Sequence, residues 1–442
     1  MQYEHRKYPL HPFDFFSDLL CIFSNQISHL VIEFESSIDQ EILKKATEIA
    51  TIAEPVTRCR VKRDIDMLWW DEIPEIRSDE LVKCLSSPEP ISVLHDALST
   101  TIDPYQGPLI RLVLIKSADQ KRGDILVVNV HHISMDGRGL KDMVNLILNQ
   151  YRLIQSEETE KLIPTSLKQR ELPRVSSLIN QENRITSPPE STISWSDDFT
   201  IPYLSLMSDR QSYSVLHLQP ERTKLIHEIR KEWNVTINDL MLATIARACA
   251  QMTDKNEDME ISLLNTVDLR RYLPHNSVRS VHNFSTAFVV EILVRKDESL
   301  RDTAMHVKTV VDAIKRGKPG LDGALEAERL YAEGHCAAKK EIEKRWEENI
   351  TSGKRIPLFS NTGIIDGELI NAVIPVHDAY ILPNHSLAPA FFFALSNFND
   401  RITISAAYYK PAFDIIAIER LFNEIDQTIP GYSTYPGIYS VI

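Results

Sequence analysis

The sequence predicts an α/β protein made of sheet and helix layers and arranged as two similar lobes. Three observations lead to this prediction. An apolar strand, Ile125 to Val130, runs directly into two histidines and precedes an amphipathic helix. The same order of strand, turn, strand and helix returns at the end of the chain, from Ala390 to Ile429. Between the two copies, from about Ser156 to Ser208, the composition shifts to Glu, Ser, Pro and Thr, which is typical of a connector.

In the first half, runs of β-branched and aromatic residues bounded by turn residues predict five strands. They lie at about 29–35, 57–61, 67–70, 109–115 and 125–130. Ser36-Ser37-Ile-Asp-Gln stands before the periodic apolar residues 42–50 and predicts a capped helix there. A second helix is expected from about 140 to 154. We therefore assign residues 1–160 to an N-terminal lobe and 161–208 to the connector.

The second half, residues 209–442, is predicted to form the C-terminal lobe. Strands are expected at about 212–218, 260–266, 287–293, 390–395 and 402–408. Helices are expected at 220–233, 321–349 and 413–429. Two further helices should begin after the capping box Thr236 to Asp239 and after Ser299 with Asp302. Where the first copy has two histidines, the second has about Tyr408-Tyr409. Two similar lobes with a single proton acceptor predict one active site, at their junction.

Size and composition exclude several classes of protein. A chain of 442 residues suits two lobes, and its formal charge of -13 argues against nucleic acid as a partner. No apolar run approaches the ~20 residues that a membrane helix needs, so no membrane span is expected. Five scattered cysteines without CxxC spacing indicate reduced thiols and a cytoplasmic location.

The residues after the apolar strand are the candidates for chemistry. Side chains alternate across a strand, so His131 and His132 should point to opposite faces, one structural and one functional. Asp136 and Gly137 should form the turn that leaves the strand, where glycine fits sterically. A hydrogen-bonded core histidine beside an ordinary Asp-Gly turn is the alternative interpretation. A metal site is not expected, because no further ligand stands at suitable spacing.

His131-His132-Ile-Ser-Met-Asp136-Gly137 resembles the HHxxxDG signature of the chloramphenicol-acetyltransferase-like acyltransferases. This group includes nonribosomal peptide condensation domains and polyketide-associated acyltransferases. Gly107-Pro-Leu-Ile-Arg111 and Val267-Asp-Leu-Arg270 resemble two further stretches of the family, so the resemblance covers nearly the whole chain. It implies two chloramphenicol-acetyltransferase-like lobes, each a mixed sheet covered by helices, with an active-site tunnel at the lobe interface.

The resemblance also implies roles for single residues. His132, the second histidine of the signature, would be the general base, and Asp136 would form a structural ion pair with Arg270 of the other lobe. A surface position beside Arg271 is the alternative for Arg270. A solvated helix start is likewise the alternative to a donor contact by Arg138.

Stabilisation of the oxyanion is expected from two places. The backbone N–H of Gly137 is one, and the other is the stretch Ser360-Asn361-Thr-Gly, which resembles a Ser-Asn-x-Gly segment of related enzymes. The basic stretch from Lys339 to Arg345 is a candidate for contact with an acidic donor, with a solvated helix face as its alternative.

The function implied is transfer of an acyl group from a thioester to a hydroxyl or amine acceptor. The donor would be acyl-coenzyme A or a phosphopantetheinyl carrier protein, used as a substrate rather than held as a permanent cofactor. If the pKa of His132 stays near its ~6.5 reference, activity should rise between about pH 6 and 7. Two alternatives remain: a peptide-bond-forming condensation protein with carrier-bound donors, and a catalytically silent scaffold of the same fold.

Overall fold

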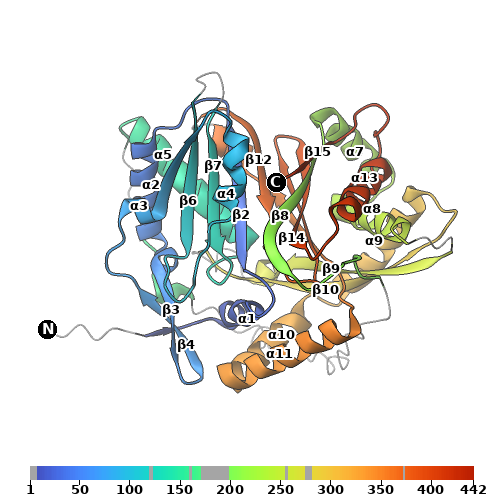
Figure 1. Ribbon diagram of the computed structural model, residues 1–442, viewed down its shortest axis with the longest axis horizontal. Helices are drawn as coiled ribbons and strands as arrows, with labels where there is room; N and C mark the ends of the chain where they lie inside the picture. Colours follow the sequence, from blue (N-terminus) through green and yellow to red (C-terminus); the bar gives the residue numbers. More distant parts are fainter. Residues whose placement is uncertain are drawn as a thin grey trace.

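The computed structural model describes residues 7–118, 123–158, 162–170, 199–253, 257–273, 281–371 and 374–442. Most of the predicted connector, including Ser187 to Ser191, lies outside these residues. Two large sheets stand side by side, and each carries its own helices (Figure 1). The predicted α/β class and the two-lobed arrangement are therefore confirmed.

The first sheet has five strands in the order β12-β2-β7-β6-β5. Its strands are β2 (Ile27–Phe34), β5 (Val82–Ser87), β6 (Ile110–Ser117), β7 (Ile125–His131) and β12 (Val376–Leu382). Only the β5–β6 pair is parallel. The strand that delivers the two histidines is thus in the middle of the sheet, between β2 and β6.

Strand β12 comes from the second half of the chain but pairs with β2 of the first sheet, where Tyr380 lies opposite Val31. The assignment of all of residues 209–442 to the second lobe did not anticipate this exchange. On its other side β12 is tied to the second sheet, because Ile381 N donates to Ser396 Oγ at 3.2 Å and its carbonyl accepts from Ser405 Oγ at 2.9 Å. The strand therefore links the two lobes (Figure 1).

The second sheet has seven strands in the order β10-β9-β11-β13-β14-β8-β15. They are β8 (Ser208–His217), β9 (Met259–Asp268), β10 (Ser285–Val294), β11 (Leu358–Ile364), β13 (Phe392–Phe398), β14 (Arg401–Pro411) and β15 (Ile438–Val441). A small third sheet holds β1 (Tyr8–Pro9), β3 (Cys59–Asp64) and β4 (Met67–Glu72). The hairpin β13–β14 followed by helix α13 repeats the order of β6, β7 and the helix after them.

Helices pack around the two large sheets (Figure 1). They are α1 (Pro12–Leu20), α2 (Gln40–Ala53), α3 (Ser78–Leu81), α4 (Leu94–Leu98), α5 (Gly137–Gln155), α7 (Pro220–Glu232), α8 (Ile237–Gln251), α9 (Leu300–Arg316), α10 (Leu321–Glu333), α11 (His335–Ser352), α12 (Gly367–Asn371) and α13 (Ile415–Thr428). The single helix predicted over 321–349 is two helices, because Gly334 adopts a φ of 84° that breaks it. No helix within the described ranges has the length and apolar character needed to cross a bilayer.

Alternation along β7 sends its side chains into two different cores. Val128 and Val130 pack in the large core beneath α2 and α5. Val127, on the opposite face, packs with Tyr213 of β8 in a smaller core between the two lobes. The carboxyl end of β7 therefore lies beside the junction of the lobes.

Candidate active site

The signature residues form a short loop between β7 and α5. The strand ends at His131, and the His132 N–H donates to the carbonyl of Gln26 at 2.7 Å. Ser134 then turns the chain, since both its N–H, at 3.0 Å, and its hydroxyl, at 2.8 Å, donate to the carbonyl of His131. Asp136 is the N-cap of α5. The main chain around the two histidines is thus held by hydrogen bonds on both sides.

His131 is the structural member of the pair. It is 1% exposed, and its Nδ1 accepts the N–H of Ile133 at 3.2 Å. Its Nε2 lies 4.0 Å from Cys21 Sγ. Burial lowers the pKa of this ring to about 3, although Asp18 acts in the opposite direction. His131 therefore stays neutral and supports the end of the strand.

His132 is partly exposed, unlike its neighbour. Burial lowers the pKa of this imidazole, while Asp136, the ring's own main-chain carbonyl and Asn283 act in the opposite direction. With a lowered pKa the ring is neutral near pH 7, which is the protonation state that a general base needs.

Asp136 and Arg270 join the two lobes. Arg270 Nη1 donates to Asp136 Oδ2 at 2.7 Å and Nη2 to Oδ1 at 3.2 Å, a bidentate pair. Asp136 also accepts from the N–H of Phe284 at 2.8 Å and caps α5 through the N–H of Gly139 at 3.0 Å. Burial by itself would raise the pKa of Asp136, but Arg270 and these N–H groups lower it below its usual range. The carboxylate is therefore a fixed anchor between the lobes, and Arg270 is not the surface residue of the alternative interpretation.

Gly137 was expected to be needed for steric reasons in the turn after the strand, but its surroundings do not require a glycine. It begins α5, and a Cβ atom there would lie at an ordinary 3.6 Å from Thr362 Cγ2. Gly139 is the crowded position, since a Cβ would come within 2.7 Å of Met135 Cβ and 3.3 Å of the His282 nitrogen. The tight turn of the loop over Met135, together with its approach to His282 of the second lobe, thus requires glycine at 139.

The stretch Ser360 to Gly363 lies on β11 at the lobe junction. Lys141 of α5 donates to the carbonyls of Thr362 and Ile364, the latter at 3.0 Å, which holds β11 against the start of α5. Ser360 Oγ is 3.0 Å from Thr266 Oγ1. Two hydroxyls that share one hydrogen bond leave one hydrogen for a further acceptor. Asn361 Oδ1 accepts from the N–H of Gly363 at 3.0 Å.

Two basic groups that are candidates for binding an acidic acyl donor already pair with carboxylates of this chain. Arg138 is exposed and lies 3.4 Å from Asp268 Oδ2 and 3.9 Å from Asp142 Oδ2. The basic stretch of α11 is paired in the same way, with Arg345 bonded to Glu326 at 2.7 Å. Contact with an acidic donor stays a prediction for both.

Three residues that the sequence patterns did not single out converge on the motif loop. Asn283 donates to the carbonyl of His132 and, at 3.3 Å, to Asp14 Oδ1. Arg170 donates to both oxygens of Asp14 at 3.0 Å and to the carbonyl of Ser134 at 2.9 Å. No local periodicity or spacing links these positions, because they come from α1, from residues 162–170 and from the segment before β10.

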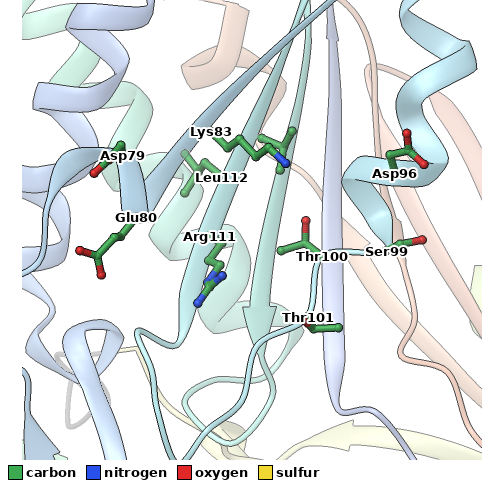
Figure 2. Close-up of a pocket in the computed structure, with 10 residues that line it drawn as sticks. Asp79, Glu80, Lys83, Asp96, Ser99, Thr100, Thr101, Arg111 and Leu112 are labelled. Carbon is green, nitrogen blue, oxygen red and sulfur yellow. The ribbon is translucent and has the colours of Figure 1, made fainter.

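Arg111, from the stretch that resembles GPLxR, lines a hollow of about 500 Å³ on the first sheet. In Figure 2 its guanidinium lies between Glu80 and Thr100, with Lys83 on the neighbouring strand. His132 is not among the residues that line this hollow. Within the described residues there is no group of three or more His, Cys, Asp or Glu side chains placed to hold a metal ion.

No protein-family model matches the chain, and no curated protein sequence does. Solved structures do match. The TRI3 trichothecene 15-O-acetyltransferase from Fusarium sporotrichioides aligns with a TM-score of 0.68 at 14% identity, over 96% of this chain and 95% of that one. The first condensation domain of the calcium-dependent antibiotic synthetase, in complex with a substrate analogue, aligns with a TM-score of 0.68 at 11% identity, over 96% and 97%.

An epimerization domain of tyrocidine synthetase B also aligns, with a TM-score of 0.60 at 14% identity, over 96% of this chain and 95% of that chain. At these identities the similarities show the fold alone. The predicted chloramphenicol-acetyltransferase-like fold, with two lobes, is confirmed over nearly the whole chain. Because proteins with different reactions share it, the reaction must be argued from the site.

Proposed function

We propose that this protein is an acyltransferase that moves an acyl group from a thioester to a hydroxyl or amine, with His132 as the general base. The observation that carries the proposal is the state of His132. It is a partly exposed, neutral imidazole in a loop that the Asp136–Arg270 pair fastens to the other lobe. The similarity to an acetyltransferase and to a condensation domain supports the same reaction class.

In the proposed reaction, His132 Nε2 takes the proton of the acceptor O–H or N–H as the acceptor oxygen or nitrogen bonds to the thioester carbonyl carbon. The tetrahedral intermediate carries its negative charge on the former carbonyl oxygen. When this intermediate collapses, the carbon–sulfur bond breaks and the leaving thiolate takes the proton back from His132. A positioned base of this kind typically contributes about 10²–10⁴-fold to the rate.

The oxyanion would be stabilised by groups at the lobe junction. The N–H of Gly137 opens helix α5, where the helix dipole favours negative charge. The hydroxyl pair of Ser360 and Thr266 has one hydrogen to donate, and Asn361 follows on the same strand. We include Gly137, Ser360 and Asn361 in the proposed site as positioned donors, and Arg138 as a contact for an anionic donor.

The experiment is a transfer assay with purified protein. Acyl-coenzyme A and acyl-loaded carrier protein are tested as donors, each with a panel of alcohols and amines, and the free thiol released is measured. His132→Gln should lower turnover by about 10²–10⁴-fold, while His306→Ala on helix α9 serves as a control histidine far along the chain. Turnover that survives unchanged in His132→Gln would refute the proposed base.

A condensation reaction is the second candidate, and the condensation domain among the structural matches favours it. Transfer only from the carrier protein and only to amines would indicate that reaction. Transfer from acyl-coenzyme A to an alcohol would indicate a free-standing acyltransferase. Absence of His132-dependent transfer with every donor and acceptor would favour the silent scaffold.

A further inference from the structure

Arg111 lies in a hollow that the proposed reaction does not use. The hollow has a volume of about 500 Å³, and its lining does not include His132. On strand β6, Val113 and Ile115 pack in the apolar core between the lobes. Alternation places Arg111 on the same face, two residues before Val113. At this end of the strand a half-buried charged side chain therefore stands where the row is otherwise apolar.

The guanidinium of Arg111 is not neutralised by its own chain. Its Nε is buried without a hydrogen-bond partner among the described residues, and none of their carboxylates forms an ion pair with it. Partial loss of hydration without a compensating partner costs free energy, and a bound anion would offset this cost. The fork of a guanidinium matches the two oxygens of a carboxylate or phosphate. The centre of the hollow therefore favours a negatively charged group.

The end of helix α4 provides hydrogen-bond acceptors on one side of the hollow. Thr100 donates its hydroxyl hydrogen to the carbonyl of Ala97 at 2.9 Å, so its oxygen can only accept from a ligand. Asp96 is exposed, and in the part of the chain that the structure describes it forms no ion pair. Both residues line the hollow on the same side of Arg111 (Figure 2). Because these groups are acceptors, this side favours a positively charged donor.

This side of the hollow is also held in place before anything binds. His95 Nε2 lies 3.0 Å from the carbonyl of Gln211 on β8 and donates to it. Ser99 Oγ lies 3.5 Å from the other ring nitrogen, Nδ1. The end of α4 is thus tied to the second lobe. A rim that is ordered in advance loses little conformational entropy when a ligand binds.

The charges around Arg111 argue against a phosphate or a simple amine as the ligand. Asp79 and Glu80 lie on the side of Arg111 away from Asp96 (Figure 2), and both pair with the exposed Arg77, at 3.3 and 3.2 Å. A phosphate group would bring about two negative charges between carboxylates on both sides, which repel it. An amine without an acidic group would leave Arg111 unpaired. A molecule with one carboxylate and one ammonium group matches both halves of the hollow.

We propose that this hollow binds a small zwitterion of the amino-acid type, with its carboxylate on Arg111 and its ammonium group on Asp96 and the oxygen of Thr100. The volume suits such a ligand, because small-molecule sites commonly measure about 300–1,000 Å³. The proposal goes beyond acyl transfer and does not depend on it, since binding is measured without turnover.

The test is isothermal titration calorimetry of the full chain with each of the common amino acids in turn. We expect at least one of them to bind with a Kd below about 1 mM. The same compound without its amino group, and inorganic phosphate, are titrated in parallel. Both should bind at least about tenfold more weakly than the amino acid, because neither gives Asp96 a charged partner.

Two variants separate the halves of the site. Arg111→Gln removes the fork and should weaken binding by about 10- to 100-fold, the effect of losing a charge-assisted hydrogen bond. Asp96→Asn should weaken binding of the amino acid by about tenfold and leave binding of its analogue without the amino group unchanged. If Arg111→Gln does not fold, Arg111→Lys, which keeps the charge but not the fork, replaces it.

Arg60→Gln is the matched control, because Arg60 is also half-buried on a strand, pairs with Asp71 and does not line the hollow. Its Kd should equal that of the unmodified protein. Absence of any amino acid with a Kd below about 1 mM would overturn the proposal. Phosphate, or the analogue without the amino group, binding as tightly as the amino acid would do the same. A Kd that is unchanged in Arg111→Gln or in Asp96→Asn would contradict the contact assigned to that residue.

Discussion

At the scale of single residues, two adjacent imidazoles differ because their surroundings differ. His131 is enclosed and accepts an N–H from the loop, whereas His132 is partly exposed. Alternation along the strand predicted the division into a structural and a functional histidine. It could not predict which ring would be enclosed, because that depends on Cys21 and on other residues far away in the sequence.

The pH dependence of the rate follows from the environment of His132. Burial lowers its pKa, so the acid limb of kcat/KM should lie below the ~6.5 of a free imidazole. Activity is lost as pH falls through the lowered pKa, because the protonated ring cannot accept a further proton. Initial rates from pH 4.5 to 8 measure this limb. A midpoint at or above pH 7 would contradict the lowered pKa.

Removing one partner of the Asp136–Arg270 ion pair should lower the free energy of unfolding strongly. In Asp136→Ala the guanidinium of Arg270 loses its main partner, and the free energy of unfolding should fall by about 3–5 kcal/mol. The double variant Asp136→Ala with Arg270→Met should cost less than the two single changes together, because no uncompensated charge remains. Urea unfolding of the four proteins measures this coupling. If the losses in unfolding free energy of the two single variants simply add up in the double variant, Asp136 and Arg270 do not stabilise each other.

At the scale of elements, the start of helix α5 carries the tightest steric constraint of the loop. Gly139→Ala should lower the melting temperature by several degrees, because its Cβ would lie 2.7 Å from Met135 Cβ and the loop or the second lobe would have to move. Gly137→Ala, two residues earlier, should be close to neutral for stability, because its nearest contact is 3.6 Å. Thermal unfolding of the two variants makes the comparison, and equal losses would contradict it.

Patterns among neighbouring residues predicted those helices and strands whose starts or repeats they mark. The capping boxes at Thr236 and Ser299 are present as expected, as are the central strand β7 and helix α5. The place of β12 in the first sheet was missed because its partner β2 lies at the other end of the chain, and a pairing over such a distance leaves no local trace in the sequence. The break at Gly334 was missed because the apolar period continues across it.

Some residues of the candidate site could likewise be predicted from local sequence, and others could not. The His-His-Asp-Gly signature and Arg270 could be proposed from motifs that are contiguous in sequence. Asn283, Asp14 and Arg170 could not, because only the fold brings their three segments together at the motif loop. Contacts of this kind are visible only once the tertiary structure is known.

At the scale of the whole molecule, buried histidines between the lobes make stability sensitive to acid. His29 bonds Asn129 at 2.6 Å and Tyr213 of the second lobe at 2.7 Å, and burial lowers its pKa to about 4. Above pH ~6.5 the ring is neutral in both the folded and unfolded chain. Below that pH only the unfolded chain takes up the proton, so the free energy of unfolding falls until the pH reaches the folded pKa. For His29 alone this amounts to ~3 kcal/mol.

The measurement is the free energy of unfolding in urea between pH 7 and 4. His29→Gln is the informative variant, because its amide can still donate to Asn129 and accept from Tyr213 but does not titrate in this range. His131 and His385, whose pKa values burial lowers to about 3, continue to contribute. The variant should therefore show a weaker fall than the unmodified protein, and an identical fall would exclude His29 as a source.

The most direct test of the account is the rate of acyl transfer by the unmodified protein and by His132→Gln under identical conditions. The substrate pair is the one for which the donor and acceptor panels give turnover. We predict a fall in kcat of about 10²–10⁴-fold with an unchanged melting temperature, because the variant removes the base and leaves the loop contacts in place. A variant that folds normally and retains the full kcat would contradict the role of His132 on which the account depends.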